Sequence, residues 1–414
     1  MTTSMAATHA ASKRLKDAIF GASAACAAAA KVHGADKVTN ATIGVMIDDE
    51  GKLASIPTME CVFRSLSIDD YVRYAPISGL PEYLDAAIDC TFADCRPEGF
   101  IAAVATAGGT GAIHHAVANY AERGDKVLTS DWYWGTYGVI CNECGCTLTN
   151  YALFDENNEF NFADYEAKVT EILKSQDSLL AIINSPAHNP TGFSLTEDDW
   201  DKVIDLTKKF AAKGKKMNLL VDIAYIDYAG EKNEVRSFMK KFSNLPDNVF
   251  VMFAFSMSKG YTAYGQRTGA LVGVSASEEV INEFKEINKY TSRATWSNIN
   301  RGAMTLLAKI QNDKETLKKF EQERDDFYKM IQERGNLFMQ EAKECGLNAL
   351  PYKGGFFLSV PAKDSQAVCD KLHDDLIFAV PLKMGVRVAA CCVSKAKMKG
   401  VAAKIKAALE AVEG

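Results

Sequence analysis

A lysine at the end of a short polar motif is the residue of this chain best suited to covalent chemistry. Lys259 closes the motif Ser-Met-Ser-Lys, and the apolar run 251–255 before the motif has the length of a buried strand. We therefore expect Lys259 where a strand emerges into a loop. Loss of water lowers the pKa of such an amine and makes it a nucleophile. Arg267, further along, adds a guanidinium that can hold a phosphate through paired hydrogen bonds.

Three other apolar runs also lead into polar motifs. They span residues 102–106, 179–183 and 218–221. The first leads to a glycine-rich turn and a predicted helix from Ala112, whose N-terminus offers N–H groups to a phosphate. The second leads to Asn189 in the sequence Asn-Pro-Thr-Gly, and the third to Asp222. Ligands of open parallel sheets bind outside the carboxyl ends of the strands, so we expect these motifs to meet at one edge.

Together the motifs predict a site for pyridoxal 5'-phosphate (PLP). The lysine can carry the cofactor covalently, and a buried carboxylate such as Asp222 favours the protonated ring nitrogen that makes PLP an electron sink. The arginine and the glycine-rich turn can hold the phosphate. Each motif alone is weaker, because Asn-Pro-Thr-Gly is also ordinary turn chemistry and a strand-end carboxylate can cap a turn.

As a set, the motifs resemble those of fold-type I PLP enzymes, and within them the class I aminotransferases nearest to aspartate and aromatic amino acid aminotransferases. The similarity runs from about Gly44 to Arg387. It implies an α/β fold with a mostly parallel seven-stranded sheet in a large PLP-binding domain, residues 51–311. Residues 1–50 and 312–414 would form a smaller, discontinuous α+β domain.

The resemblance also implies roles for individual residues. Lys259, Asp222 and Tyr225 would be catalytic, with Lys259 as the covalent anchor and proton carrier and Asp222 at the ring nitrogen. The cofactor would further contact Tyr74, Gly109, Thr110, Gly111, Trp134, Asn189, Ser256, Ser258 and Arg267. The substrate would contact Gly44, Trp134, Asn189, Arg293 and Arg387, with Arg387 on its α-carboxylate.

Arg293 and Tyr74 carry the expectations about substrate and assembly. Arg293 lies four residues before Ser297, the spacing at which dicarboxylate-specific relatives place an arginine that reaches across a dimer interface. Tyr74 matches a tyrosine that touches the neighbouring subunit's phosphate. We expect a homodimer with shared active sites that transaminates aspartate, glutamate and, as further candidates, aromatic amino acids with a 2-oxo acid such as 2-oxoglutarate. Gly108 and Asn184 depart from the aspartate aminotransferase pattern of serine and histidine, which leaves fine specificity open.

Other reactions on the same fold share the cofactor residues. A C–S lyase, an aspartate decarboxylase and a cyclopropane-forming synthase therefore remain alternatives. A PLP-sensing transcription regulator is a further one, but it would need a basic helix-turn-helix module, and only about forty residues precede Gly44.

Composition narrows the class of protein. The 414 residues carry a net charge of −6 with both signs interspersed, so we expect no nucleic-acid partner. No uncharged apolar run reaches about 18 residues, so we expect no membrane span. The eleven cysteines fit reduced thiols of a cytoplasmic enzyme. Cys141, Cys144 and Cys146 have metal-like spacing but lack a matching second pair, so we expect no metal.

Overall fold

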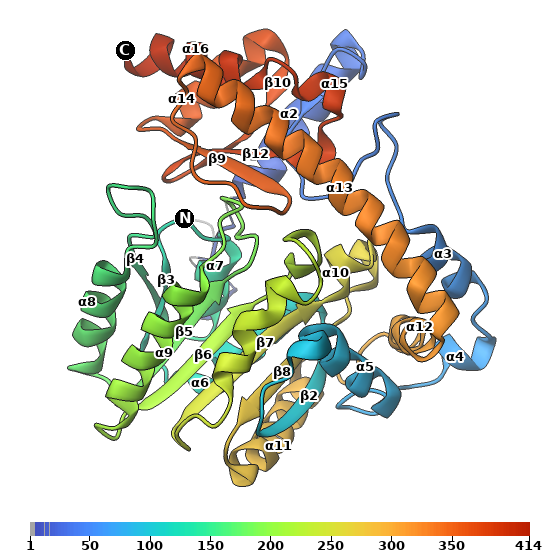
Figure 1. The fold of residues 1–414 in the computed structure, drawn as a ribbon, viewed down its shortest axis with the longest axis vertical. Helices are drawn as coiled ribbons and strands as arrows, with labels where there is room; N and C mark the ends of the chain where they lie inside the picture. The colour runs from blue at the N-terminus through green and yellow to red at the C-terminus, as the bar shows by residue number, and fades with distance from the viewer. Residues whose placement is uncertain (1–4, 12, 16) are drawn as a thin grey trace.

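A computed structural model describes residues 5–11, 13–15 and 17–414 of the chain. The fold is built around a seven-stranded sheet (Figure 1). The strands are β2 (Phe100–Thr106), β3 (Lys126–Ser130), β4 (Thr147–Tyr151), β5 (Ser178–Asn184), β6 (Lys216–Asp222), β7 (Val249–Ser256) and β8 (Gly269–Ser275). Their order is β2-β8-β7-β6-β5-β3-β4, and only β8 runs antiparallel to its neighbours. The predicted mostly parallel seven-stranded sheet is confirmed.

Helices cover both faces of this sheet (Figure 1), which explains why its central strands are continuously apolar. One face packs against α5 (Pro81–Phe92), α8 (Phe162–Leu173) and α9 (Glu197–Ala211). The other packs against α6 (Gly108–Tyr120), α7 (Thr136–Glu143) and α11 (Glu278–Thr295). All eight residues of β7 are buried. The four strands expected from apolar runs are present as β2, β5, β6 and β7.

Two local expectations need correction. The glycine-rich turn after β2 is itself the first turn of α6, which begins at Gly108 rather than at Ala112. Lys259 lies in a one-turn helix, α10 (Met257–Gly260), and not in an open loop. Ser256 caps this helix, because its Oγ accepts a hydrogen bond from the backbone N–H of Ser258 at 3.2 Å.

A second structural unit contains two small sheets. The strands β11 (Val380–Leu382), β12 (Gly385–Ala389) and β9 (Phe357–Pro361) form an antiparallel sheet in that order, and β1 (Thr39–Asn40) pairs with β10 (Ile377–Phe378). The pairing of β1 with β10 joins the N-terminal part of the chain to its C-terminal part. It supports, as a proposal, a small domain formed by residues 1–50 and 312–414.

The remaining helices link and cover these units. They are α1 (Thr8–Ala11), α2 (Ala18–His33), α3 (Pro57–Arg64), α4 (Ile68–Val72), α12 (Arg301–Asn312), α13 (Lys314–Cys345), α14 (Ser365–Leu372), α15 (Lys395–Met398) and α16 (Val401–Glu413). The 32-residue helix α13 runs diagonally from the region of α12 to the small sheets (Figure 1). Among the described residues, no helix is long and apolar enough to cross a membrane.

Candidate active site

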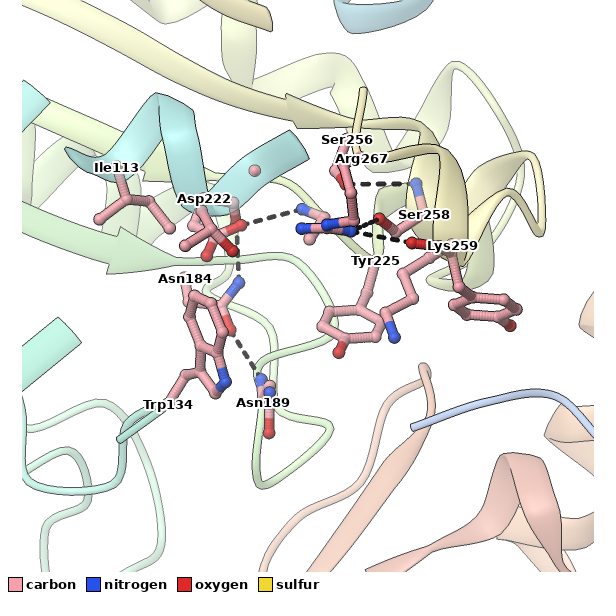
Figure 2. A pocket seen from close by; sticks show the side chains of 14 residues that line it. Ile113, Trp134, Asn184, Asn189, Asp222, Tyr225, Ser256, Ser258, Lys259 and Arg267 are labelled. Carbon is pink, nitrogen blue, oxygen red and sulfur yellow. Dashed lines mark hydrogen bonds between the residues drawn. The ribbon is translucent and has the colours of Figure 1, made fainter. Parts of the chain in front are cut away.

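A cavity of about 280 Å³ lies at the carboxyl ends of β5, β6 and β7, beside the first turn of α6 (Figure 2). It is where the sheet topology brings the strand-end motifs together. The predicted site residues among its lining are Gly109, Thr110, Trp134, Asn189, Asp222, Tyr225, Ser256, Ser258, Lys259 and Arg267. Their roles remain predictions, but their convergence on one cavity follows from the fold.

Lys259 is a partly buried amine at one end of this cavity. Its Nζ donates a hydrogen bond to the carbonyl of Gly44 and lies 4.8 Å from the centre of the Tyr264 ring. Loss of water lowers the pKa of Lys259 to about 8. Gly44 permits this approach, because a Cβ there would lie 2.8 Å from Cζ of Phe357. More of this amine is therefore neutral and nucleophilic near neutral pH than of a lysine in water.

At another part of the cavity, the guanidinium of Arg267 lies beside the N-terminus of α6. Arg267 donates from Nη1 to Ser258 Oγ at 3.1 Å and to the Tyr264 carbonyl at 2.9 Å. A Cβ on Gly108 would lie 2.8 Å from Nη2 of Arg267, so glycine is what lets the guanidinium approach the start of α6. Gly108 also has φ +68°, which favours glycine. A guanidinium beside the N-terminus of a 13-residue helix is well suited to a phosphate.

Asp222 supplies a buried carboxylate at the end of β6. Its Oδ2 accepts a hydrogen bond from the Tyr137 hydroxyl at 2.6 Å, and its Oδ1 accepts one from the Ala224 N–H at 3.0 Å. Burial raises the pKa of Asp222, and these two hydrogen bonds oppose that effect. Asn184 donates to the backbone carbonyl of Asp222 at 2.8 Å (Figure 2). The carboxylate is thus held firmly where a protonated ring nitrogen could pair with it.

Two aromatic side chains line the space between these groups. Trp134 lies in the cavity and meets Tyr137 edge-on, with ring centroids 5.7 Å apart. Tyr225 is buried, and its ring centre lies 5.6 Å from Lys259 Nζ. Burial raises the pKa of Tyr225, so its phenol stays protonated and can donate to a cofactor oxygen.

Arg387 lies on β12, at the border between the small sheet and the cavity residue Asn189. It is buried, and it donates from Nη2 to the Thr42 carbonyl at 2.6 Å and from Nη1 to Asn189 Oδ1 at 3.3 Å. Its guanidinium stacks over Phe357 at 4.3 Å. The Nε atom is buried without a hydrogen-bond partner among the described residues. A buried guanidinium with a spare donor is suited to a substrate carboxylate.

Five predicted site residues do not line the cavity: Gly44 and Arg387, described above, and Tyr74, Arg293 and Gly111. Tyr74 is 89% exposed, and Arg293 is exposed at the end of α11, where its Nη1 donates to Ser297 Oγ at 2.6 Å. Gly111 is buried and faces Trp296, since a Cβ on it would lie 2.9 Å from Cη2 of that ring. Gly111 contributes close packing to the start of α6, and the roles expected for Tyr74 and Arg293 in a neighbouring subunit remain predictions.

The sequence patterns did not predict the parts that Tyr264 and Tyr137 play at this site, nor that Ile113, Asn184 and Ala224 line its cavity. Tyr264 lines the cavity beside Lys259, and its hydroxyl accepts a hydrogen bond from the Met46 N–H at 3.1 Å. Its position three residues before Arg267 was a usable signal. Tyr137 bonds to Asp222 from behind the cavity lining. Nothing in its local sequence distinguishes it from the nearby Tyr133.

The residues present fit PLP. Lys259 can anchor the cofactor, Asp222 can pair with its ring nitrogen, and Arg267 and the start of α6 can bind its phosphate. Gly109 keeps the phosphate end open, since a Cβ there would already lie 3.3 Å from Cβ of Ser256.

The sequence of this chain is similar to those of known aminotransferases. The family model "Aminotransferase class I and II" matches residues 36–405. An aspartate aminotransferase of Salmonella typhi is 26% identical over 319 residues, which are 75% of this chain and 77% of that protein. An aromatic-amino-acid aminotransferase of Paracoccus denitrificans is 28% identical over 262 residues, which are 62% and 63% of the two chains.

Solved structures show the same relation. The crystal structure of an aminotransferase from Anaerococcus prevotii is 37% identical and covers 98% of this chain and 100% of its own, with a TM-score of 0.96. That of an aromatic-amino-acid aminotransferase from Burkholderia pseudomallei, covalently bound to pyridoxal phosphate, has a TM-score of 0.79 at 21% identity, covering 98% and 100%. The fold is therefore that of fold-type I aminotransferases and the cofactor is PLP. The cavity around Lys259, the match over most of the chain and the shared fold establish that this protein belongs to the family of class I and II aminotransferases.

Proposed function

We propose that this aminotransferase transaminates aspartate and glutamate, with aromatic amino acids as additional candidate substrates, and uses a 2-oxo acid such as 2-oxoglutarate as amino acceptor. The observation that carries the substrate class is a pair of guanidinium groups. Arg387 is buried beside Asn189, and Arg293 is displayed on the surface at the end of α11. Two guanidiniums match the two carboxylates of a dicarboxylic amino acid.

The exposed side chain of Arg293 makes a hydrogen bond within its own chain. Its hydrogen bond to Ser297 spans one helical turn, and Ser297 has φ +72°, an uncommon backbone conformation for serine. The guanidinium therefore has one intramolecular hydrogen bond, at the point where the chain leaves α11. An exposed arginine with free N–H donors is suited to bind an anion presented by a second molecule.

An exposed apolar surface on α4 and the residues just after it supports a homodimer with shared active sites. Four large apolar side chains, Ile68, Tyr71, Val72 and Tyr74, are 67%, 53%, 65% and 89% exposed within seven residues of sequence. Such clusters are uncommon on surfaces that face only water. We propose that a second copy of the chain covers them, which would bring Tyr74 and Arg293 to the partner's cavity.

The residues of the cavity would divide the reaction among them. Bound PLP supplies an electron sink for the bond that breaks at the substrate α-carbon. Arg387 would orient the substrate by its α-carboxylate, and Lys259, once freed, would take the α-proton and return it. Asp222 would keep the positive charge on the ring nitrogen, and Tyr225 and Asn189 would hold the oxygen next to the reacting carbon.

Absorbance titration of the holoenzyme with single amino acids tests the proposal. Aspartate and glutamate should convert the cofactor fully to its amine form and release the matching 2-oxo acid, and 2-oxoglutarate should reverse the change. Release of ammonia or carbon dioxide as the main product would instead support a C–S lyase or a decarboxylase.

We also propose that the enzyme acts in the cytoplasm. All eleven cysteines are free in the structure, and Cys26, Cys95, Cys141, Cys146, Cys369, Cys391 and Cys392 are buried. Burial raises the pKa of Cys141 to about 12, which makes it a small core residue rather than a reactive thiolate. Free buried thiols are typical of proteins in a reducing compartment.

A further inference from the structure

Tyr137 is the one side-chain hydrogen-bond donor to the Asp222 carboxylate among the described residues. It lies in the first turn of α7 and is 1% exposed. Its hydroxyl lies 2.6 Å from Oδ2 of Asp222, a short distance typical of a hydrogen bond to a charged acceptor. Asn184 donates a hydrogen bond to the backbone carbonyl of Asp222 and not to its carboxylate.

The carboxylate depends on such a donor. Burial raises the pKa of Asp222, which favours its neutral form, while the Tyr137 hydroxyl stabilises the charged form. Burial and the nearby Asp222 charge raise the pKa of Tyr137 well above its usual range. The phenol therefore keeps its proton and remains a donor throughout the working pH range.

Tyr137 also contacts the aromatic residue of the cavity. Its ring meets the Trp134 ring edge-on at 5.7 Å and 85°. One buried side chain therefore touches both the group proposed to stack on the cofactor ring and the group proposed to pair with the ring nitrogen. The ring contact and the hydroxyl contact can be separated by a tyrosine-to-phenylalanine change, which keeps the former and removes the latter.

We propose that Tyr137 is a positioning residue for transamination: its hydroxyl keeps Asp222 ionised and oriented, so that the proton shared with the cofactor stays on the ring nitrogen. The proposal rests on the role proposed above for Asp222. The Tyr137 and Ala224 hydrogen bonds use one acceptor site on each carboxylate oxygen, which leaves the carboxylate free to accept from the ring nitrogen.

The test is Tyr137→Phe in holoenzyme reconstituted with PLP labelled with ¹⁵N in the ring. Without the hydroxyl, Asp222 becomes the stronger base and draws the proton toward itself. We expect the ring ¹⁵N resonance to move toward that of unprotonated pyridine. We expect kcat to fall about ten- to a hundredfold, with KM and the PLP dissociation constant changed less than about threefold, because the phosphate contacts are intact. A loss of kcat with the ¹⁵N resonance unmoved would overturn the proposal, because it would assign Tyr137 a packing role.

Two further variants make the outcome specific. Tyr83→Phe removes another fully buried hydroxyl, one with no hydrogen-bond partner in the described part of the chain, and should leave the resonance and kcat unchanged. Asp222→Asn should move the resonance at least as far as Tyr137→Phe. If Asp222→Asn does not move the ¹⁵N resonance, the role proposed for Asp222 is wrong. If Asp222→Asn moves the resonance and Tyr137→Phe does not, only the role proposed for Tyr137 is wrong.

A graded replacement covers the case in which phenylalanine does not fold. Incorporation of 4-aminophenylalanine at position 137 keeps a weaker N–H donor on the same ring. The ¹⁵N resonance should then lie between those of the wild type and Asp222→Asn. A resonance identical to that of the wild type, despite the weaker donor, would also contradict the proposal.

Discussion

At the scale of single residues, Lys259 illustrates how the fold changes an ordinary side chain. Lysine in water has a pKa near 10.5, and loss of water around Lys259 lowers it to about 8. Lys259 lies in α10, directly after the carboxyl end of the buried strand β7, and the Gly44 carbonyl orients its amine. Reactivity therefore arises from burial, while orientation comes from a residue 215 positions away in sequence.

The first prediction concerns that lysine. Lys259→Ala should fold, bind PLP without a covalent bond and lose transamination by about three or more orders of magnitude, because covalent anchor and proton carrier are lost together. Absorbance spectra and single-turnover assays with aspartate measure both effects. Turnover comparable to the wild type would reject the assignment.

The second prediction is the pH dependence of the apo-protein. Because the pKa of Lys259 is lower in the folded than in the unfolded state, its burial costs stability below pH 8, and that cost disappears as pH rises toward 10.5. Lys259→Met should therefore stabilise the apo-protein by up to about 3 kcal/mol at pH 7 and by much less at pH 9.5. Urea denaturation midpoints of both proteins at the two pH values check this; a gain independent of pH would mean that the amine is not desolvated.

The third prediction separates charge from shape at Asp222. Asp222→Asn should lower kcat by about two or more orders of magnitude and weaken PLP binding much less, because the phosphate contacts of Arg267 and α6 remain. Steady-state kinetics and a PLP titration of the apo-protein give the two numbers. Equal losses in both would make Asp222 mainly structural.

At the scale of elements, α6 and α11 are joined by a row of polar contacts. His115 bonds to Ser292 at 3.0 Å and stacks on Trp296, and Asn119 donates to Asn288 at 3.1 Å. The N-terminus of α6 lines the cavity, and the C-terminal turn of α11 carries Arg293. These contacts therefore fix the distance between the proposed phosphate site and the proposed specificity arginine.

The fourth prediction tests this junction. Asn288 is fully buried, and its Nδ2 donates to the Tyr120 hydroxyl at 3.2 Å and the Phe284 carbonyl at 2.8 Å. Asn288→Leu should destabilise the protein by about 1–3 kcal/mol, because buried polar groups lose their partners. Thermal denaturation measures the effect. Asn282→Leu, on the exposed face of the same helix, is the matched control and should change stability by less than about 0.5 kcal/mol.

At the scale of the whole molecule, the proposed dimer would complete each active site. The chain holds Lys259 and Asp222 in one cavity, with Arg387 bonded to the cavity residue Asn189, while Tyr74 and Arg293 are exposed. Substrate class would then be decided by residues of a second subunit. The exposed apolar cluster of Ile68, Tyr71, Val72 and Tyr74 is the surface that we expect such an association to cover.

The fifth prediction combines substrate choice with assembly. Arg293→Leu should lower kcat/KM for aspartate by about two or more orders of magnitude and for phenylalanine much less, because only aspartate brings a second carboxylate. Equal losses for both substrates would contradict the dicarboxylate assignment.

Mixing variants checks that the sites are shared. Arg293→Leu and Lys259→Ala dimers, unfolded and refolded together, should regain about a quarter of wild-type aspartate activity, because half of the dimers then hold one intact site of two. No recovery in mixed dimers verified by mass spectrometry would mean that Arg293 serves its own subunit.

The sequence by itself determined the cofactor, the sheet and the residues at the strand ends. Those signals are local: an apolar run of strand length followed at once by Lys259, Asp222 or the turn at Asn189. Strands with both faces covered must be apolar throughout, and parallel strands must present their carboxyl ends together, so a local pattern suffices.

Only the tertiary structure decided which distant groups tune these residues. Tyr137 lies 85 positions from Asp222, and Thr42 lies 345 positions from Arg387. The tertiary structure also decided that Lys259 lies in the short helix α10 and that Gly111 packs against Trp296. Such contacts depend on how helices and sheets pack against one another, and side chains brought together by packing leave no periodic or adjacent pattern in the sequence.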